Sequence, residues 1–153
     1  MNIHDYIDHQ KTEDRRAFII HYPAKSGKTY FAQALLRTRS DVYLLDLQEH
    51  FVNQPGLPPV RKWDFEALRK LLLSIGVPQS VIIVDNPDFL FNTWSTAEKQ
   101  SLLNWVRVGL RSPAETEKTF VFIVQNDDVI STGSFTNAHG EPRVLALNEF
   151  ESV

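Results

Sequence analysis

The sequence predicts an α/β domain built as a three-layer sandwich around a five-stranded parallel sheet. Five short runs rich in Val, Ile, Leu or Phe recur along the chain without alternating with polar residues, a pattern typical of strands buried on both faces. Segments with helical spacing follow the first three runs, and this alternation predicts parallel strands joined by right-handed crossovers. The runs are residues 17–21, 42–47, 81–84, 119–124 and 144–147.

Three segments between the runs carry apolar residues at spacings of three and four, which predicts helices with one buried face. The first covers residues 28–37. The second covers residues 65–75, with Asp64 placed to cap its start and a Gly and a Pro just beyond its end. In the third, Thr96 is placed to cap a helix that ends near Ser112-Pro113.

The remaining segments predict loops and an N-terminal extension. Residues 48–62 contain three prolines and a glycine, and residues 131–142 are rich in small polar residues. Loops of this length are uncommon inside a compact domain, and those that occur are often functional. We treat residues 1–15 as an extension and residues 1–153 as a single domain, since a chain of this length favours one core.

Composition excludes several classes of protein. Hydrophobic residues make up 42% of the chain and the net charge is −3, which argues against a disordered chain and against nonspecific coating of nucleic acid. The chain has no cysteine, which excludes disulfides, thiol nucleophiles and cysteine-ligated zinc. Its five histidines show no metal-ligand spacing. With no apolar run long enough for a signal peptide or a membrane span, we expect a soluble, cytoplasmic protein.

The segment between the first apolar run and the first helix predicts a phosphate-binding loop. Backbone N–H groups of such a loop surround a triphosphate, and the N-terminus of the following helix adds its positive dipole end. Gly27 lets the backbone approach the phosphates, Lys28 neutralises their charge, and Thr29 ligates Mg²⁺. The predicted ATP-binding residues are Tyr22, Pro23, Ala24, Lys25, Ser26, Gly27, Lys28, Thr29 and Tyr30.

Tyr22 departs from the expected loop pattern, which begins with glycine. A tyrosine does not easily adopt the positive φ values open to glycine, so the loop must turn differently or bind less tightly. An alternative is that the ring lies beside the base or ribose.

The third apolar run delivers a carboxylate, Asp85, to the C-terminal end of a strand, where ligands gather in doubly wound sheets. We expect Asp85 to hold Mg²⁺ opposite Thr29. The next residue is Asn86, which cannot accept a proton from an attacking water, so slow hydrolysis or binding alone is expected. Asp88, Asp46 and Glu49 are candidate substitutes, and the sequence does not choose among them.

The fourth run ends in polar residues, of which Gln125 or Asn126 is placed to contact the terminal phosphate or the water. The alternative is that Asn126 and Asp127 build a turn or cap.

Together these residues resemble the P-loop NTPases of the additional-strand class and, within it, the AAA+ nucleotide-binding core. The segments 25–36 and 81–86 look like those of bacterial replication initiators and their regulators. The resemblance implies the strand order 5-1-4-3-2 and an arginine, here Arg143, that reaches the nucleotide of a neighbouring subunit. The implied catalytic residues are Lys28, Asp85, Asn126 and Arg143. The helical lid of AAA+ proteins is not expected, because the chain ends soon after the last run.

The sequence is similar to the small P-loop proteins of type 3 BREX phage-defence systems, the BrxF family. The similarity lies in the length, in the loop that begins with tyrosine and in the truncated core. That resemblance implies an ATP-binding accessory subunit that works with larger DNA-modifying and ATPase partners. Two alternatives stay open: an initiator-like regulator or loader that hydrolyses ATP in a self-assembled ring, and a nucleotide-free scaffold. Direct DNA contact through the pairs Arg15-Arg16 and Arg61-Lys62 is a weaker expectation than indirect contact through partners.

Overall fold

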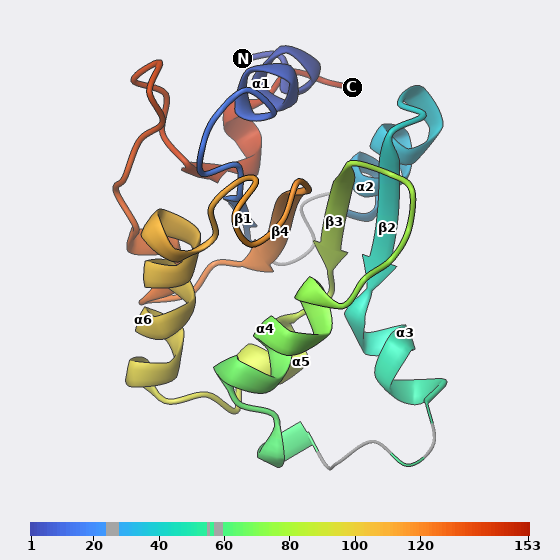
Figure 1. The fold of residues 1–153 in the computed structure, drawn as a ribbon, viewed down its shortest axis with the longest axis vertical. Coiled ribbons are helices and arrows are strands. Elements are labelled where there is room, and N and C mark those ends of the chain that lie inside the picture. The colour runs from blue at the N-terminus through green and yellow to red at the C-terminus, as the bar shows by residue number, and fades with distance from the viewer. Residues whose placement is uncertain (24–27, 55, 57–59) are drawn as a thin grey trace.

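The computed structural model describes residues 1–23, 28–54, 56 and 60–153. Its centre is a five-stranded sheet in the order β2-β3-β4-β1-β5, with every neighbouring pair parallel (Figure 1). The strands are β1 (Phe18–Tyr22), β2 (Val42–Asp46), β3 (Val81–Asp85), β4 (Thr119–Gln125) and β5 (Val144–Ala146). The five predicted runs are therefore confirmed as strands, and their order is the one that the resemblance implies.

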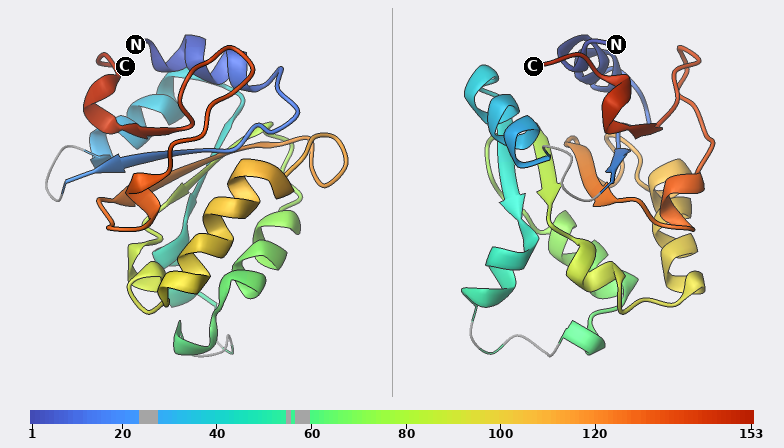
Figure 2. Two further views of the ribbon diagram at one scale, coloured as in Figure 1. Left: turned by 90° about the vertical axis from the view of Figure 1, so that its left-hand side faces the viewer. Right: turned by 180° about the vertical axis from the view of Figure 1, so that it is seen from behind.

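Helices cover both faces of the sheet, which is consistent with the predicted three-layer sandwich. Figure 2 shows α1 (Ile3–Gln10) and α2 (Lys28–Thr38) on one side, and α4 (Phe65–Leu73) and α6 (Thr96–Asn104) on the other. Successive residues of β1 point to opposite faces of the sheet. Phe18 packs with the first pair of helices and Ile19 packs with the second. Burial on both faces is the reason that the strands are apolar throughout.

Within the segment 1–15 that was expected to be an N-terminal extension, the helix α1 packs into the core. The Asn2 side chain caps α1 by accepting hydrogen bonds from the amides of His4 and Asp5. Tyr6 is buried, packs edge-on against Phe18 at 4.7 Å between ring centroids, and donates its hydroxyl to the Pro142 carbonyl at 2.7 Å. The buried side chains of α1 recur at spacings of three and four, the pattern of one helix face, and the sequence analysis did not use this signal.

Two helix starts test the capping predictions. Asp64 caps α4, as predicted, by accepting from the Ala67 amide at 2.9 Å. At α6 the prediction is wrong by one residue, because Ser95 rather than Thr96 accepts from the Glu98 amide, at 3.2 Å. The helical path beyond α6 continues as a π-helical turn over Trp105–Gly109.

The expected loop at 48–62 is partly helical. A short helix, α3 (Leu47–Val52), begins directly after β2 because the Asp46 side chain accepts from the Glu49 amide at 3.1 Å and caps it. The other expected loop, 131–142, is irregular beyond a single 3₁₀ turn (Ile130–Thr132) and one bridge between Thr136 and Pro142. A further short helix that the sequence analysis missed, α5 (Asp88–Phe91), follows β3.

Candidate functional site

The C-terminal ends of the strands gather polar side chains along one edge of the sheet, the carboxyl edge. In the strand register, Tyr22 at the end of β1 faces Gln125 at the end of β4. Asp46 at the end of β2 faces Asp85 at the end of β3 in the same way. Because all five strands are parallel, these ends meet at the edge where α/β sheets bind ligands.

The connection from β1 to α2 leaves from this edge. β1 ends at Tyr22, the exposed Pro23 follows, and α2 begins at Lys28. The predicted loop residues Ala24, Lys25, Ser26 and Gly27, and the side chains of Lys28 and Thr29, lie outside the described residues. The eleven-residue helix α2 therefore begins close after the end of β1, with its positive dipole end at the predicted loop.

Tyr30, in the first turn of α2, is exposed. Its side chain is 65% accessible, and the Arg37 guanidinium lies 5.9 Å from the centroid of its ring. Tyr30 is thus the accessible aromatic side chain next to the predicted loop.

Tyr22 has the opposite environment. It is 3% exposed and belongs to the same cluster of buried residues as Ile20 and Phe31. Its hydroxyl donates to Asp88 Oδ2 at 3.4 Å. Burial first, and then the charges of Asp88 and Asp85, raise the pKa of Tyr22, so the phenol stays neutral. The suggestion that its ring lies beside a base or ribose does not fit a side chain with so little exposed surface.

Asp85 is buried at the end of β3, with 6% of its surface exposed. Its Oδ1 accepts a hydrogen bond from the amide of Asn86 at 3.0 Å. Asn86 adopts a φ of 55°, in the left-handed region that asparagine tolerates better than most residues. The side chain of Asp85 is thus held by the turn that follows it, at the position expected for a metal ligand.

Asp88, a candidate substitute for the missing base, ties three strand ends together. Its Oδ1 accepts the Gln125 amide at 2.7 Å, while Oδ2 accepts the Tyr22 hydroxyl. Both carboxylate oxygens of Asp88 are thus engaged by protein donors, which favours a structural role.

At the end of β4 the structure shows the turn of the alternative interpretation, and the contact of Gln125 or Asn126 with a phosphate stays a prediction. The Asn126 amide donates to the Tyr22 carbonyl at 2.8 Å, and its side-chain Oδ1 lies 2.8 Å from His21 Nδ1, which donates in this pair. Asp127 builds the following turn by accepting from the amides of Val129 and Ile130. Asn126 is exposed beside the predicted loop, and His21 is its partner, which the sequence analysis did not identify.

A cavity of about 440 Å³ opens beside Asp85, between α2, β2 and α3. Its lining includes three carboxylates, those of Asp46, Glu49 and Asp85. The other lining residues are Gln33, Tyr43, Leu44, Leu45, His50, Asn53, Gln54 and Asn86. The sequence analysis did not single out Gln33, although its place one helical turn after Thr29 was a signal that could have identified it. On α3, Glu49 was one of the candidate substitutes for the missing base, whereas His50 was missed because that segment was predicted to be a loop.

Arg143 does not have the exposure that the predicted trans-acting role requires. It is 2% exposed, and its guanidinium donates to the Ala17 carbonyl at 2.8 and 3.1 Å and to the Val106 carbonyl at 2.5 Å. The Phe135 ring covers it at 5.0 Å from the ring centroid. Burial is the main cause that lowers its pKa to about 10, which leaves it charged at neutral pH. In this structure Arg143 holds the backbone carbonyls of Ala17, Val106 and Arg107 together.

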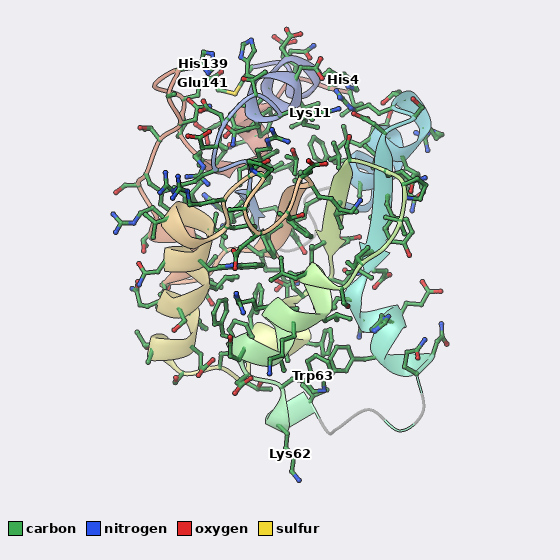
Figure 3. All side chains as sticks on the ribbon, viewed as in Figure 1. His4, Lys11, Lys62, Trp63, His139 and Glu141 are labelled. Carbon is green, nitrogen blue, oxygen red and sulfur yellow. The ribbon has the colours of Figure 1, made fainter. Side chains whose placement is uncertain are left out.

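The two basic pairs, considered for direct DNA contact, lie in different environments. Arg15 donates to the Val108 carbonyl, and Arg16 donates to the carbonyls of Glu13 and Glu117. Lys62 points away from the body of the molecule (Figure 3), while the side chain of Arg61 lies outside the described residues. The first pair therefore has a structural role, and Lys62 is exposed.

The described part of the chain contains neither a candidate membrane-spanning helix nor a candidate metal-holding cluster. No helix there is both long and apolar enough to cross a membrane. No group of three or more His, Asp or Glu residues there is arranged to hold a metal ion without other ligands. Comparisons of the chain with protein-family models, curated proteins and solved structures gave no match.

Proposed function

We propose that the chain binds a nucleoside triphosphate, ATP, together with Mg²⁺ at the carboxyl edge, between the β1–α2 connection and Asp85. One observation carries the proposal: β4 separates β1 from β3, and β3 ends in the buried carboxylate of Asp85. This is the strand order of the additional-strand NTPases, combined in this chain with the sequence Gly27-Lys28-Thr29 at the junction between the β1–α2 connection and α2.

The donor set fits magnesium bound together with phosphate. Mg²⁺ prefers oxygen ligands and is usually held by one or two carboxylates, water and substrate phosphates rather than by a cage of protein ligands. Asp85 and the Thr29 hydroxyl would supply the protein oxygens. When bound, the ion would neutralise phosphate charge.

The proposed biological role is that of an accessory subunit in a phage-defence complex, with nucleotide occupancy changing the surface that partners recognise. It rests on the resemblance to the BrxF family. Asn86 in place of an acid supports slow turnover. The net charge of −3 and the structural use of Arg15 and Arg16 favour DNA contact through partners over direct contact.

Titration with a fluorescent ATP analogue, with and without Mg²⁺, tests binding. The wild type is expected to bind, and Lys28→Ala should lose about 10- to 100-fold in affinity, because a charge-assisted contact contributes roughly 1.5–3 kcal/mol. Lys70→Ala, on the surface of α4, is the matched control and should bind like the wild type. Equal and negligible binding by the wild type and Lys28→Ala would reject the proposal.

A nucleotide-free scaffold is the second candidate, and the environment of Tyr22 favours it. At the position where a phosphate loop begins with glycine, a buried tyrosine is tied to Asp88. The same titration separates the two candidates, because a scaffold binds no nucleotide. The ring-ATPase alternative is not developed further, because the arginine that motivated it is buried.

A further inference from the structure

We infer that Glu49, on α3, is the general base that activates water in the slow hydrolysis of the bound nucleotide. The inference rests on the proposed function and deepens it, since it assigns the proton acceptor that Asn86 cannot supply. It starts from the cavity beside Asp85, which α3 and Asp85 line together.

The cavity has room for a nucleophile. Its volume of about 440 Å³ compares with about 30 Å³ for one water molecule in the liquid. Asp85 and Asn86 line it on one side, and Gln33 lines it from α2, one turn after Thr29. Water in this space would lie next to the carboxylate proposed to hold the metal.

Three other acids near this edge have engaged side chains. Asp85 accepts the amide of Asn86 and is the proposed metal ligand. Asp46 accepts the amide of Glu49 as the cap of α3. Asp88 accepts the Gln125 amide and the Tyr22 hydroxyl.

Glu49 differs from these three acids. It is exposed, its side chain lines the cavity, and among the residues that the structure describes no hydrogen bond or ion pair engages its carboxylate. The Asp46 cap fixes the first turn of α3 and so fixes the position from which Glu49 projects. His50 also lines the cavity, but its ring packs edge-on against Phe51.

The proposed step is hydrolysis of the bond between the terminal phosphate and the diphosphate, with Glu49 as the proton acceptor. Glu49 accepts one proton from water as the water oxygen bonds to the terminal phosphorus. The bond between that phosphorus and the bridging oxygen breaks, and its electron pair leaves on the diphosphate. The products are nucleoside diphosphate and inorganic phosphate, and the proton passes from Glu49 to solvent.

The test measures binding and hydrolysis separately on the purified chain. Glu49→Gln should bind the fluorescent ATP analogue with wild-type affinity, while its single-turnover rate with Mg²⁺-ATP falls about 10²- to 10⁴-fold. Chromatography of the protein-bound nucleotide should recover triphosphate from Glu49→Gln and diphosphate from the wild type. Glu117→Gln, an exposed glutamate just before β4, is the matched control and should behave like the wild type.

The outcomes distinguish the two proposals. Binding without an effect of Glu49→Gln on turnover overturns the role of Glu49 and leaves nucleotide binding intact. Binding without any turnover by the wild type, or a loss seen with His50→Gln instead, also overturns it. Absence of binding by the wild type rejects the proposed function itself.

Discussion

The two edges of the sheet use charge in different ways. At the amino edge, just before the strands begin, charged side chains are engaged by protein groups: Lys118 donates to the carbonyls of Val77 and Gln79, and Asp41 accepts from Arg39 and Lys11. At the carboxyl edge, carboxylates line an open cavity, and that of Glu49 has no partner among the described residues. The paired charges of the amino edge hold segments of the chain together. The carboxylate of Glu49, beside the cavity, is available to a ligand.

Substitution of Arg143 is expected to change the free energy of unfolding more than any other substitution considered. It tests whether charged residues at the amino edge have a structural role. Arg143→Ala should lower the free energy of unfolding by roughly 3 kcal/mol or more, because it leaves the Ala17 and Val106 carbonyls without their charged donor. Urea denaturation measures this, with the exposed Arg111→Ala as control. A variant as stable as the wild type but deficient in concentration-dependent ATP turnover would restore the trans-acting role.

Substitution of Tyr22 is expected to change the free energy of unfolding less than substitution of Arg143. It tests whether the carboxyl edge also contains structural contacts. Tyr22→Phe removes the hydroxyl that donates to Asp88 and should cost about 1 kcal/mol at neutral pH. Tyr30→Phe, which alters an exposed ring, should change stability by less than about 0.5 kcal/mol.

The pH dependence of the Tyr22 effect has a definite sign. Because the pKa of Tyr22 is raised in the folded state, the unfolded chain ionises first, near the ordinary tyrosine pKa of about 10. The contribution of Tyr22 to stability is complete below that pH and falls as pH rises above it. Tyr22→Phe should therefore show a smaller alkaline loss of stability than the wild type. An equal loss in both proteins would contradict the assigned environment.

Much of the fold could be predicted from the sequence, because burial on both faces forces a continuous apolar run. β3 is the clearest case, since all five of its residues are buried. α1 and α3 could not be predicted in the same way. α1 shows no continuous apolar run, because its buried residues recur at the three- and four-residue spacing of one helix face. α3 depends on Asp46 acting as a cap directly at the end of a strand.

Residues of the candidate site could be predicted where the signal lies in adjacent residues of the sequence. They could not be predicted where their role depends on contacts with distant segments. Asp85 follows directly from an apolar run that ends in an acid, and the structure places it at the carboxyl edge. The Arg143 sequence context did not reveal its role, because the carbonyls that bind it come from residues 17, 106 and 107. The cavity beside α3 likewise depends on the packing of segments distant in sequence.

The most direct test of the central claim is calorimetric titration of a non-hydrolysable ATP analogue into the wild type and Asp85→Asn, with and without Mg²⁺. Asparagine keeps the Oδ1 acceptor for the Asn86 amide and removes the negative charge. Mg²⁺ should raise the affinity of the wild type by about 10- to 100-fold and leave that of Asp85→Asn nearly unchanged. An equal gain from Mg²⁺ in both proteins, or no binding by either, would contradict a metal–nucleotide site at the carboxyl edge.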